Sequence, residues 1–437
     1  MKKIFLTISI ITLITVNIFS QDSIYTFNNQ VFHFENNNWY VLDEATSEKF
    51  KINPRSFTVK LKEQIPYIAF ENFCQAQNIS IIRKNKLGYI DIHLPENSNF
   101  RNFYGILKNK AFFENIHLNS YGKSTSEETN YPNDPFFNEQ YYLFDYYEQG
   151  WPSIDVLGAW DIENGSTNQV TVAVIGMGFD LLHTDLFFTS GYNYVLNENP
   201  NWPIYTDIEQ HHETAIAGII AAKTNNEIGI SGIAGGWYPN NPGAVIMPLK
   251  VGEGRFYALE VIDDAIIYAA ENGAKVINMS FVIPPSAALE AAVKYAYNQY
   301  GCILISTTGH YGGTGMPYPA RYSEVLAIGG ILKDWSRLGR IGEQPDDIDA
   351  VAPAEDIFTT FNADNYGNIG SGTSFAAPQV AGISALLLSK HPNLIPMDIK
   401  NIVKHASVYE PNMENDPLKF GNGLIKADRA LNAIIQN

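Results

Sequence analysis

Apolar and polar residues follow two different patterns along the chain. Between residues 23 and 117 the apolar runs are short, and the run at residues 57–61 alternates Phe-Thr-Val-Lys-Leu, which is typical of a half-buried strand. Beyond residue 170, continuous apolar runs alternate with helical ones. We predict strands at 170–175, 244–251, 275–281, 302–307 and 325–331, and helices at 212–223, 259–271 and 287–300. The alternation predicts an α/β fold, in which a parallel sheet carries helices on both faces and binds ligands at its carboxyl edge.

A polar segment separates these two patterns. Residues 122–135 are rich in Ser, Thr, Glu, Asn and Pro and have the composition of an exposed linker. We therefore expect a small α+β unit over residues 21–125 and a larger domain over residues 126–437.

The first 20 residues have the pattern of a secretory signal peptide. Lys2 and Lys3 precede an apolar stretch from residue 4 to 18, and Phe-Ser-Gln follows it. A stretch of this length is shorter than the roughly 20 residues that cross a bilayer. We expect cleavage, no membrane span, and a secreted, periplasmic or extracellular protein.

Composition narrows the classes of partner and site. The 437 residues include 29 Lys and Arg against 46 Asp and Glu, a net charge of −17, which argues against binding to nucleic acid or anionic membranes. Only Cys74 and Cys302 are present, which excludes a disulfide framework and a zinc site built mainly on thiolates.

The most informative motif lies before a predicted helix. Residues 371–382 read Ser-Gly-Thr-Ser-Phe-Ala-Ala-Pro-Gln-Val-Ala-Gly, so that Ser374 comes just before an apolar helix with Pro378 in its first turn. A helix N-terminus offers free N–H groups and positive potential, which can stabilise the oxyanion that forms when a serine attacks a carbonyl. An isolated serine in this position would be an ordinary N-cap.

This motif and several others resemble the subtilisin-like serine peptidases, the subtilases, over nearly all the chain after residue 131. Residues 372–378 resemble that family's nucleophile motif, Gly-Thr-Ser-x-Ala-x-Pro. Blocks at residues 131–137, 158–162, 172–175, 183–186, 217–222, 229–234, 276–280, 318–320 and 352–353 recur in the family's order. The resemblance implies a subtilisin-like fold with helices on both faces of a parallel sheet, and a pro-domain at residues 21–125 that assists folding and inhibits the site until it is removed.

The resemblance also shows departures in the catalytic blocks. The histidine block, His-Gly-Thr-His-Val-Ala-Gly, reads His-Glu-Thr-Ala-Ile-Ala-Gly from His212, which keeps the base. The aspartate block, Asp-Ser/Thr-Gly, reads Gly-Met-Gly from Gly176, without the carboxylate that would orient the imidazole. Asp180 and Asp185 match other family aspartates and are expected to be structural. Glu213 is not expected to take the place of this carboxylate beside His212, because consecutive helix residues point about 100° apart. A carboxylate in the first turn of a helix is explained more simply by the helix dipole.

Two further departures affect the oxyanion donor and the peptide-binding strand. The family's Ala-Gly-Asn block reads Thr-Gly-His and ends at His310, which could still donate a hydrogen bond to an oxyanion. The family's Ser-Leu-Gly becomes Ser280, Phe281 and Val282, which adds a branched side chain where a peptide would lie. In subtilisin, loss of the triad aspartate lowers kcat about 3 × 10⁴-fold and loss of the side-chain oxyanion donor about 10² to 10³-fold.

These departures favour a catalytically impaired, secreted pseudo-peptidase, expected to be a monomer, that binds a peptide or protein. The alternative is an active serine endopeptidase, in which Ser374 is the nucleophile and His212 the base. A third class, a carbohydrate-binding surface protein, is suggested only by the 25 Tyr, 25 Phe and 6 Trp, most of which should be core residues. We expect no cofactor and no catalytic metal. Structural calcium is common in the family, but no carboxylate spacing assigns a site here.

Overall fold

The computed structural model describes residues 23–27, 30–35, 38–42, 49–84, 87–95, 112–120, 131–144, 149–197, 211–253, 256–310 and 312–433. The expected signal peptide lies outside these residues, as does most of the expected linker. The chain forms two compact units, Met1–Thr125 and Ser126–Asn437, and the division between them falls within the polar segment.

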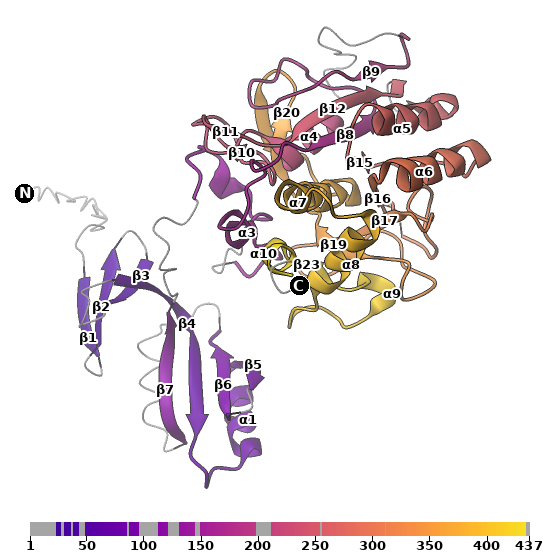
Figure 1. The fold of residues 1–437 in the computed structure, drawn as a ribbon. Helices are drawn as coiled ribbons and strands as arrows, with labels where there is room; N and C mark the ends of the chain where they lie inside the picture. Colours follow the sequence, from indigo (N-terminus) through magenta and orange to yellow (C-terminus); the bar gives the residue numbers. More distant parts are fainter. Residues whose placement is uncertain are drawn as a thin grey trace, which may run out of the picture. The chain divides into compact units, whose positions relative to one another are not determined.

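The first unit is a sheet with a helix packed on it (Figure 1). Its strands are, in sheet order, β1 (Ser23–Phe27), β2 (Gln30–Glu35), β3 (Asn38–Leu42), β4 (Lys49–Leu61), β6 (Tyr89–His93) and β5 (Ser80–Lys84), and β7 (Phe113–Ser120) pairs with β4. The alternating run at residues 57–61 is the end of β4, where Phe57 and Val59 are buried against Phe70 and Cys74 of helix α1 (Tyr67–Ala76). The observed unit is thus of α+β type.

The second unit contains a mostly parallel sheet. Its strands are, in sheet order, β22 (Ser407–Val408), β23 (Leu424–Ile425), β19 (Ala350–Pro353), β17 (Val325–Ile331), β16 (Ile303–Thr307), β15 (Val276–Met279), β8 (Thr171–Gly176), β12 (Val245–Lys250) and β9 (Tyr192–Asn193), and β18 (Arg337–Leu338) pairs with β17. The pairs from β19 to β9 are parallel. Each strand predicted from an apolar run is present, with ends that differ from the prediction by no more than about two residues.

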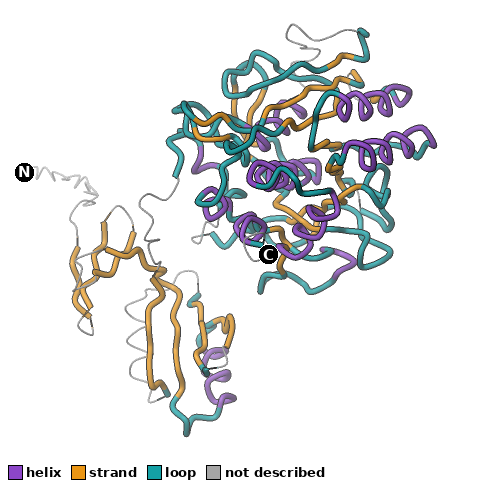
Figure 2. Tube along the Cα trace, viewed as in Figure 1, coloured by secondary structure: helices purple, strands orange, loops and turns teal. Residues whose placement is uncertain are grey.

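Helices cover both faces of this sheet, as predicted (Figure 2). They are α3 (Val156–Trp160), α4 (His212–Ala221), α5 (Ile262–Glu271), α6 (Ala287–Tyr300), α7 (Ala377–Lys390), α8 (Pro396–Ala406), α9 (Pro417–Phe420) and α10 (Ala427–Asn432), with 3₁₀ turns η1 (Phe137–Glu139), η2 (Leu259–Val261) and η3 (Thr373–Phe375). Along β8, Val172 and Val174 join the core under α4 and α7, whereas Ala173 and Ile175 join the core under α5 and α6. Burial on both faces explains why the strands are continuous apolar runs.

Local signals explain where the helices begin and end. The Ser286 hydroxyl accepts a hydrogen bond from the Leu289 N–H at the start of α6, and Gly301 ends the same helix with φ of 66°. Pro378 lies in the first turn of α7, where its missing N–H has no intrahelical partner. None of the described helices is long and apolar enough to cross a bilayer.

The order of the strands indicates where this sheet can bind a ligand. The chain runs from β8 to β12 on one side and then, through α5, to β15 on the other side of β8. The direction of winding therefore reverses at β8, and the carboxyl ends of β8 and β15 flank the reversal. Open α/β sheets bind ligands at such a switch point. Among the described residues of this unit, further strands form antiparallel hairpins: β10 (Gly236–Trp237) with β11 (Asn241–Pro242), β13 (Gly252–Glu253) with β14 (Phe256–Tyr257), and β20 (Phe358–Phe361) with β21 (Asn365–Asn368).

Candidate active site

A cavity of about 900 Å³ lies at the carboxyl ends of the central strands. Met177 after β8, Ser280 after β15 and Thr307 at the end of β16 line it, together with the start of α4 and the turn before α7. The site residues expected from the sequence all line this cavity: His212, Ser280, Phe281, Val282, His310 and Ser374. Residues that lie far apart in the sequence therefore meet in one cleft.

Ser374 lies in the η3 turn that leads into α7. The Gly372 N–H donates to the Ala354 carbonyl at 2.8 Å, and the Ser374 carbonyl accepts from the Ser280 hydroxyl at 2.9 Å. The Ser374 backbone is thus fixed from two other segments, while the residue is only half-buried and lines the cavity. The helix start beyond it contributes the positive potential that the sequence predicts.

His212 is the first residue of α4, and its ring is held by the next residue. The His212 Nδ1 atom lies 3.0 Å from Oε1 of Glu213. The His212 side chain is 27% exposed, and the Glu213 side chain is 1% exposed. The Phe375 ring lies 5.5 Å from the imidazole, centroid to centroid, and limits its movement on another side. A neutral His212 that donates from Nδ1 to this carboxylate has its Nε2 lone pair free to accept a proton.

The expectation that Glu213 points away from His212 is wrong. Side chains of consecutive helix residues leave the helix about 100° apart, but this angle fixes only the first bond of each side chain. The Glu213 side chain rotates about several further bonds, and its carboxylate reaches Nδ1. The dipole of α4 favours the same carboxylate, so the two explanations of Glu213 are compatible.

The backbone at Gly176 lies directly beside this carboxylate. A Cβ atom added to Gly176 would lie 2.1 Å from Cγ, 2.4 Å from Cδ and 2.3 Å from Oε1 of Glu213. Non-bonded carbon atoms do not approach so closely. The Glu213 carboxylate therefore fills the space into which a side chain at the end of β8 would project.

The charge of Glu213 affects the pKa values of Tyr257 and Lys250. Burial raises the pKa of the Tyr257 phenol well above its usual range, and the charge of Glu213 adds to the increase. Burial lowers the pKa of the Lys250 ammonium, whereas the charges of Glu253 and Glu213 oppose this effect. Lys250 pairs with Gly176 across β12 and β8, so it lies on the strand next to the site.

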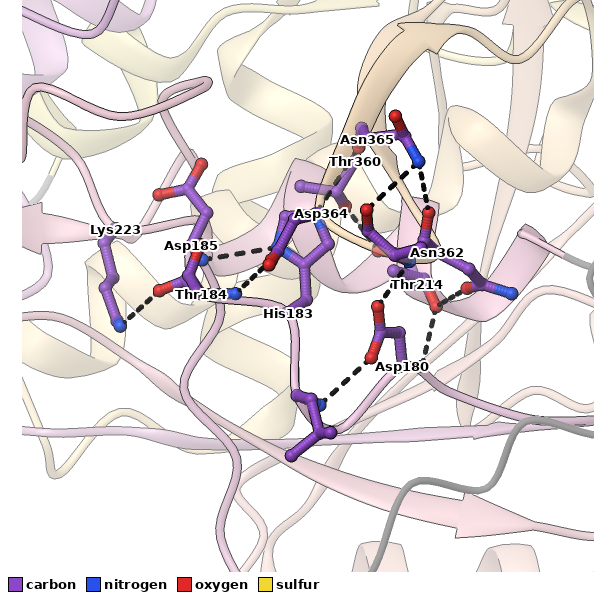
Figure 3. A network of polar contacts seen from close by, with 12 residues as sticks. Asp180, His183, Thr184, Asp185, Thr214, Lys223, Thr360, Asn362, Asp364 and Asn365 are labelled. Atoms are coloured by element: carbon purple, nitrogen blue, oxygen red, sulfur yellow. Dashed lines mark hydrogen bonds and ion pairs between the residues drawn. The ribbon is translucent and has the colours of Figure 1, made fainter.

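A polar network joins the start of α4 to the β20–β21 hairpin (Figure 3). The Thr214 hydroxyl donates to the Asn362 side-chain oxygen at 2.7 Å, and the Asp180 carboxylate accepts from the Ala363 N–H at 2.7 Å. The Thr360 hydroxyl donates to the Thr214 carbonyl at 2.7 Å. These bonds fix the first turn of α4, and hence His212, relative to the hairpin.

His211 and Asp185 have other contacts. The His211 ring stacks on Phe361, with centroids 4.7 Å apart, and its Nδ1 accepts from the Asn362 N–H. Asp185 accepts from the Asn226 side chain at 2.7 Å and from the Ile230 N–H at 3.1 Å. Within the described ranges, no group of three or more His, Cys, Asp or Glu side chains could hold a metal ion.

The remaining expected site residues have different degrees of burial. His310 is exposed, Val282 is 48% exposed and Phe281 is buried. The Ser280 hydroxyl accepts from the Asn278 side chain at 3.0 Å and donates to the Ser374 carbonyl. Ser280 therefore supports the turn that contains Ser374 and also lines the cleft.

Sequence reasoning missed the contact between Glu213 and His212 and the proximity of Gly176 to Glu213, although a signal was present. Relative to the resembled blocks, Gly176 lacks a carboxylate and Glu213 adds one next to the histidine. In the fold these two positions adjoin, because a Cβ atom at Gly176 would lie against the Glu213 side chain. Arg340 and Tyr257, which also line the cleft, carried no signal in the sequence, because their loops approach it only in the tertiary structure.

A doubly covered α/β sheet, with a serine and a histidine in one cleft at its switch point, is the architecture of an α/β serine peptidase. The chain belongs to the subtilase family, whose model matches residues 167–423, more than half of the chain.

Individual relatives agree with this assignment. A thermophilic serine proteinase of Bacillus sp. (strain AK1) is 37% identical over 60% of this chain and 61% of its own length. A halolysin-like extracellular serine protease of Natrialba magadii is 28% identical over 79% of this chain and 61% of its own length. The matches therefore span about three-fifths of the length of these two relatives. A solved protease structure from Pseudoalteromonas arctica is similar with a TM-score of 0.57 and 25% identity, over 70% of this chain and 99% of that one.

Proposed function

We propose that this protein is a secreted serine endopeptidase, in which Ser374 is the nucleophile and His212 the general base. The observation that carries the proposal is that the imidazole in the Ser374 cleft is held through Nδ1, at 3.0 Å from a carboxylate oxygen. An imidazole held in this way presents Nε2 to a proton donor, as serine catalysis requires. Family membership supports the same activity.

The proposed reaction has two stages. The Ser374 Oγ bonds to the carbonyl carbon of the peptide while its proton passes to His212 Nε2, and the C–N bond then breaks as Nε2–H protonates the leaving amine. Water hydrolyses the resulting ester by the same proton transfers, which releases the acid and regenerates the serine. We assign stabilisation of the oxyanion to N–H groups at the start of η3 and to the ring of His310, which lines the cleft.

The cleft also supports a second candidate, the pseudo-peptidase favoured by the sequence. Val282 is a half-exposed branched residue that lines the cleft, and His310 replaces a smaller amide donor of the resembled block. Both features would alter how a peptide lies against Ser374. They weaken oxyanion stabilisation or substrate fit, which is a smaller loss than the absence of an oriented base.

We further propose that residues 1–20 are a cleaved signal peptide and residues 21–125 a pro-domain. The division between the compact units near residue 125 supports this assignment. An extracellular relative in the family supports secretion.

Intact mass separates the two candidate functions. The wild-type protein is expected to lose about 100 residues after signal removal, the size of a small folded unit, and to react with a fluorophosphonate probe, whereas Ser374→Ala should do neither. Ser323→Ala, which changes an exposed serine outside the cleft, is the matched control and should behave as wild type. If the wild-type protein retains residues 21–125 and does not react with the probe, the pseudo-peptidase is the correct function.

A further inference from the structure

We propose that Glu213 is the carboxylate that orients His212 in this peptidase, and that Gly176 is small because Glu213 occupies its side-chain space. This inference rests on the proposed function. The resembled blocks place the orienting carboxylate at the end of β8, so the structure assigns that role to a different element, helix α4. Glu213 is a positioning residue, since it acts through His212.

The hydrogen bond supplies the first argument. Oε1 of Glu213 lies 3.0 Å from Nδ1 of His212, within hydrogen-bond range for a pair in which the acceptor is charged. With Nδ1–H donating to Glu213, Nε2 is the proton acceptor, and the imidazolium formed during acylation is stabilised by an adjacent anion.

The burial of Glu213 supplies the second argument. Its side chain is 1% exposed, and Oε2 has no hydrogen-bond partner among the described residues. Burial of a carboxylate in this manner opposes folding, and the favourable interaction with the helix dipole is much smaller than this desolvation cost. A role at the helix N-terminus alone would be served better by an exposed carboxylate. A buried carboxylate whose partner is the imidazole of the cleft is accounted for by a functional role.

Steric exclusion supplies the third argument. A Cβ at Gly176 would lie 2.1–2.4 Å from Cγ, Oε1 and Cδ of Glu213. Any side chain at the end of β8 must therefore displace the Glu213 carboxylate from His212. Conversely, removal of the Glu213 side chain opens the space for a carboxylate from residue 176. The two positions form a pair in which one carboxylate excludes the other.

A double-mutant cycle measured by enzyme turnover tests whether the side chains at positions 176 and 213 exclude each other. The proteins are wild type, Gly176→Asp, Glu213→Gly and the double variant, each assayed for kcat and KM on a peptide ester and for thermal unfolding. Each single variant should lose about 10² to 10⁴-fold in kcat with little change in KM. The kcat of the double variant should be at least about tenfold higher than that of Glu213→Gly, because the introduced carboxylate at position 176 can then face His212.

The unfolding data provide the same test without turnover. The Gly176→Asp change should lower the unfolding temperature when Glu213 is present, and much less when residue 213 is glycine. If the two changes add independently in both kcat and stability, the inference is wrong.

The isosteric variant Glu213→Gln tests whether misfolding explains the losses. The amide keeps the packing, but it carries no negative charge to stabilise the imidazolium of His212. We therefore expect kcat to fall about 10² to 10⁴-fold while the unfolding temperature does not decrease. A kcat within about threefold of wild type would overturn the inference. Glu213→Asp should retain more activity than Glu213→Gln.

Failure of the proposed function would be distinguishable from failure of this inference. If wild type neither turns over substrate nor reacts with the fluorophosphonate, the proposed function fails. The low-field proton resonance expected for His212 Nδ1–H, present in wild type and absent in Glu213→Gln, would then still test the contact. Its presence in both proteins would overturn the inference.

Discussion

At the scale of single residues, one buried amide supports the turn that contains Ser374. Gln379 is completely buried in α7, and its Nε2 donates to the carbonyl oxygens of Pro353 at 2.6 Å and Phe375 at 2.9 Å. Phe375 follows Ser374 directly, and Pro353 ends β19. One side chain therefore links the turn that contains Ser374 to the central sheet.

Replacement of Gln379 by Leu should destabilise the protein by about 2–4 kcal/mol. The side-chain volume is nearly retained, but two buried carbonyl groups lose a donor. Urea unfolding measures the effect. Ser384→Ala in the same helix is the control, because its hydroxyl donates to the Val380 carbonyl of its own helix, and it should change stability by less than about 1 kcal/mol. Equal effects of the two variants would contradict the assigned role of Gln379.

At the scale of elements, the β20–β21 hairpin and α4 form one polar assembly (Figure 3). Asp180, which follows β8, accepts from the N–H groups of Leu182 and Ala363. Ala363 has a φ of 60° in the hairpin turn, a conformation that a non-glycine residue adopts at a cost. The bond to Asp180 helps to hold the turn in this conformation.

Removal of the Asp180 carboxylate should therefore loosen the hairpin. We expect Asp180→Ala to lower stability by about 2–4 kcal/mol and to accelerate proteolytic cleavage within residues 358–368, because two N–H groups lose a buried charged acceptor. Mass spectrometry of the first fragments locates the cleavage. Asp364→Ala, which removes a half-exposed acceptor of the Thr184 N–H, is the control and should have a smaller effect. Cleavage at the same sites and rate in both variants would contradict the proposal that Asp180 holds the hairpin in place.

At the scale of the whole molecule, one buried carboxyl links stability to pH. Burial raises the pKa of Asp185 to about 7, although bonds from the Ile230 N–H and the Asn226 side chain oppose the increase. The ordinary value in an unfolded chain is about 3.9. Between these two pH values the folded protein retains a proton that the unfolded chain has lost. The free energy of unfolding from this group therefore falls as pH rises from about 4 to about 7.

The variant Asp185→Asn should remove this part of the pH dependence. A shift of about three pH units corresponds to about 4 kcal/mol as an order of magnitude, so the variant should gain stability relative to wild type as pH rises from about 4.5 to about 7.5. Urea unfolding at both pH values, with a chelator present, measures the difference. The net charge of −17 contributes its own slope to both proteins, so the comparison between them isolates Asp185. Parallel pH profiles would contradict the prediction, and Asp346→Asn, which changes an exposed carboxylate, should give such parallel profiles.

Much of the architecture could be predicted from the sequence because it depends on local patterns. Continuous apolar runs predicted the parallel strands, and the segment at residues 287–300 was predicted with the bounds of α6. The prediction for 259–271 covered the η2 turn and α5 together, because apolar periodicity does not distinguish a 3₁₀ turn from the α-helix that follows it. Ser374 and His212 were found through motifs that retain their order and spacing.

The sequence by itself determined the α/β fold, the serine before α7 and the histidine at the start of α4, because each follows from nearby residues. Only the tertiary structure decided which carboxylate meets His212. That choice depends on the space at the end of β8, where Gly176 and Glu213 approach from different elements. Helical geometry alone indicated the wrong direction for Glu213, since it fixes where a side chain starts, and the packing around it fixes where the carboxylate ends.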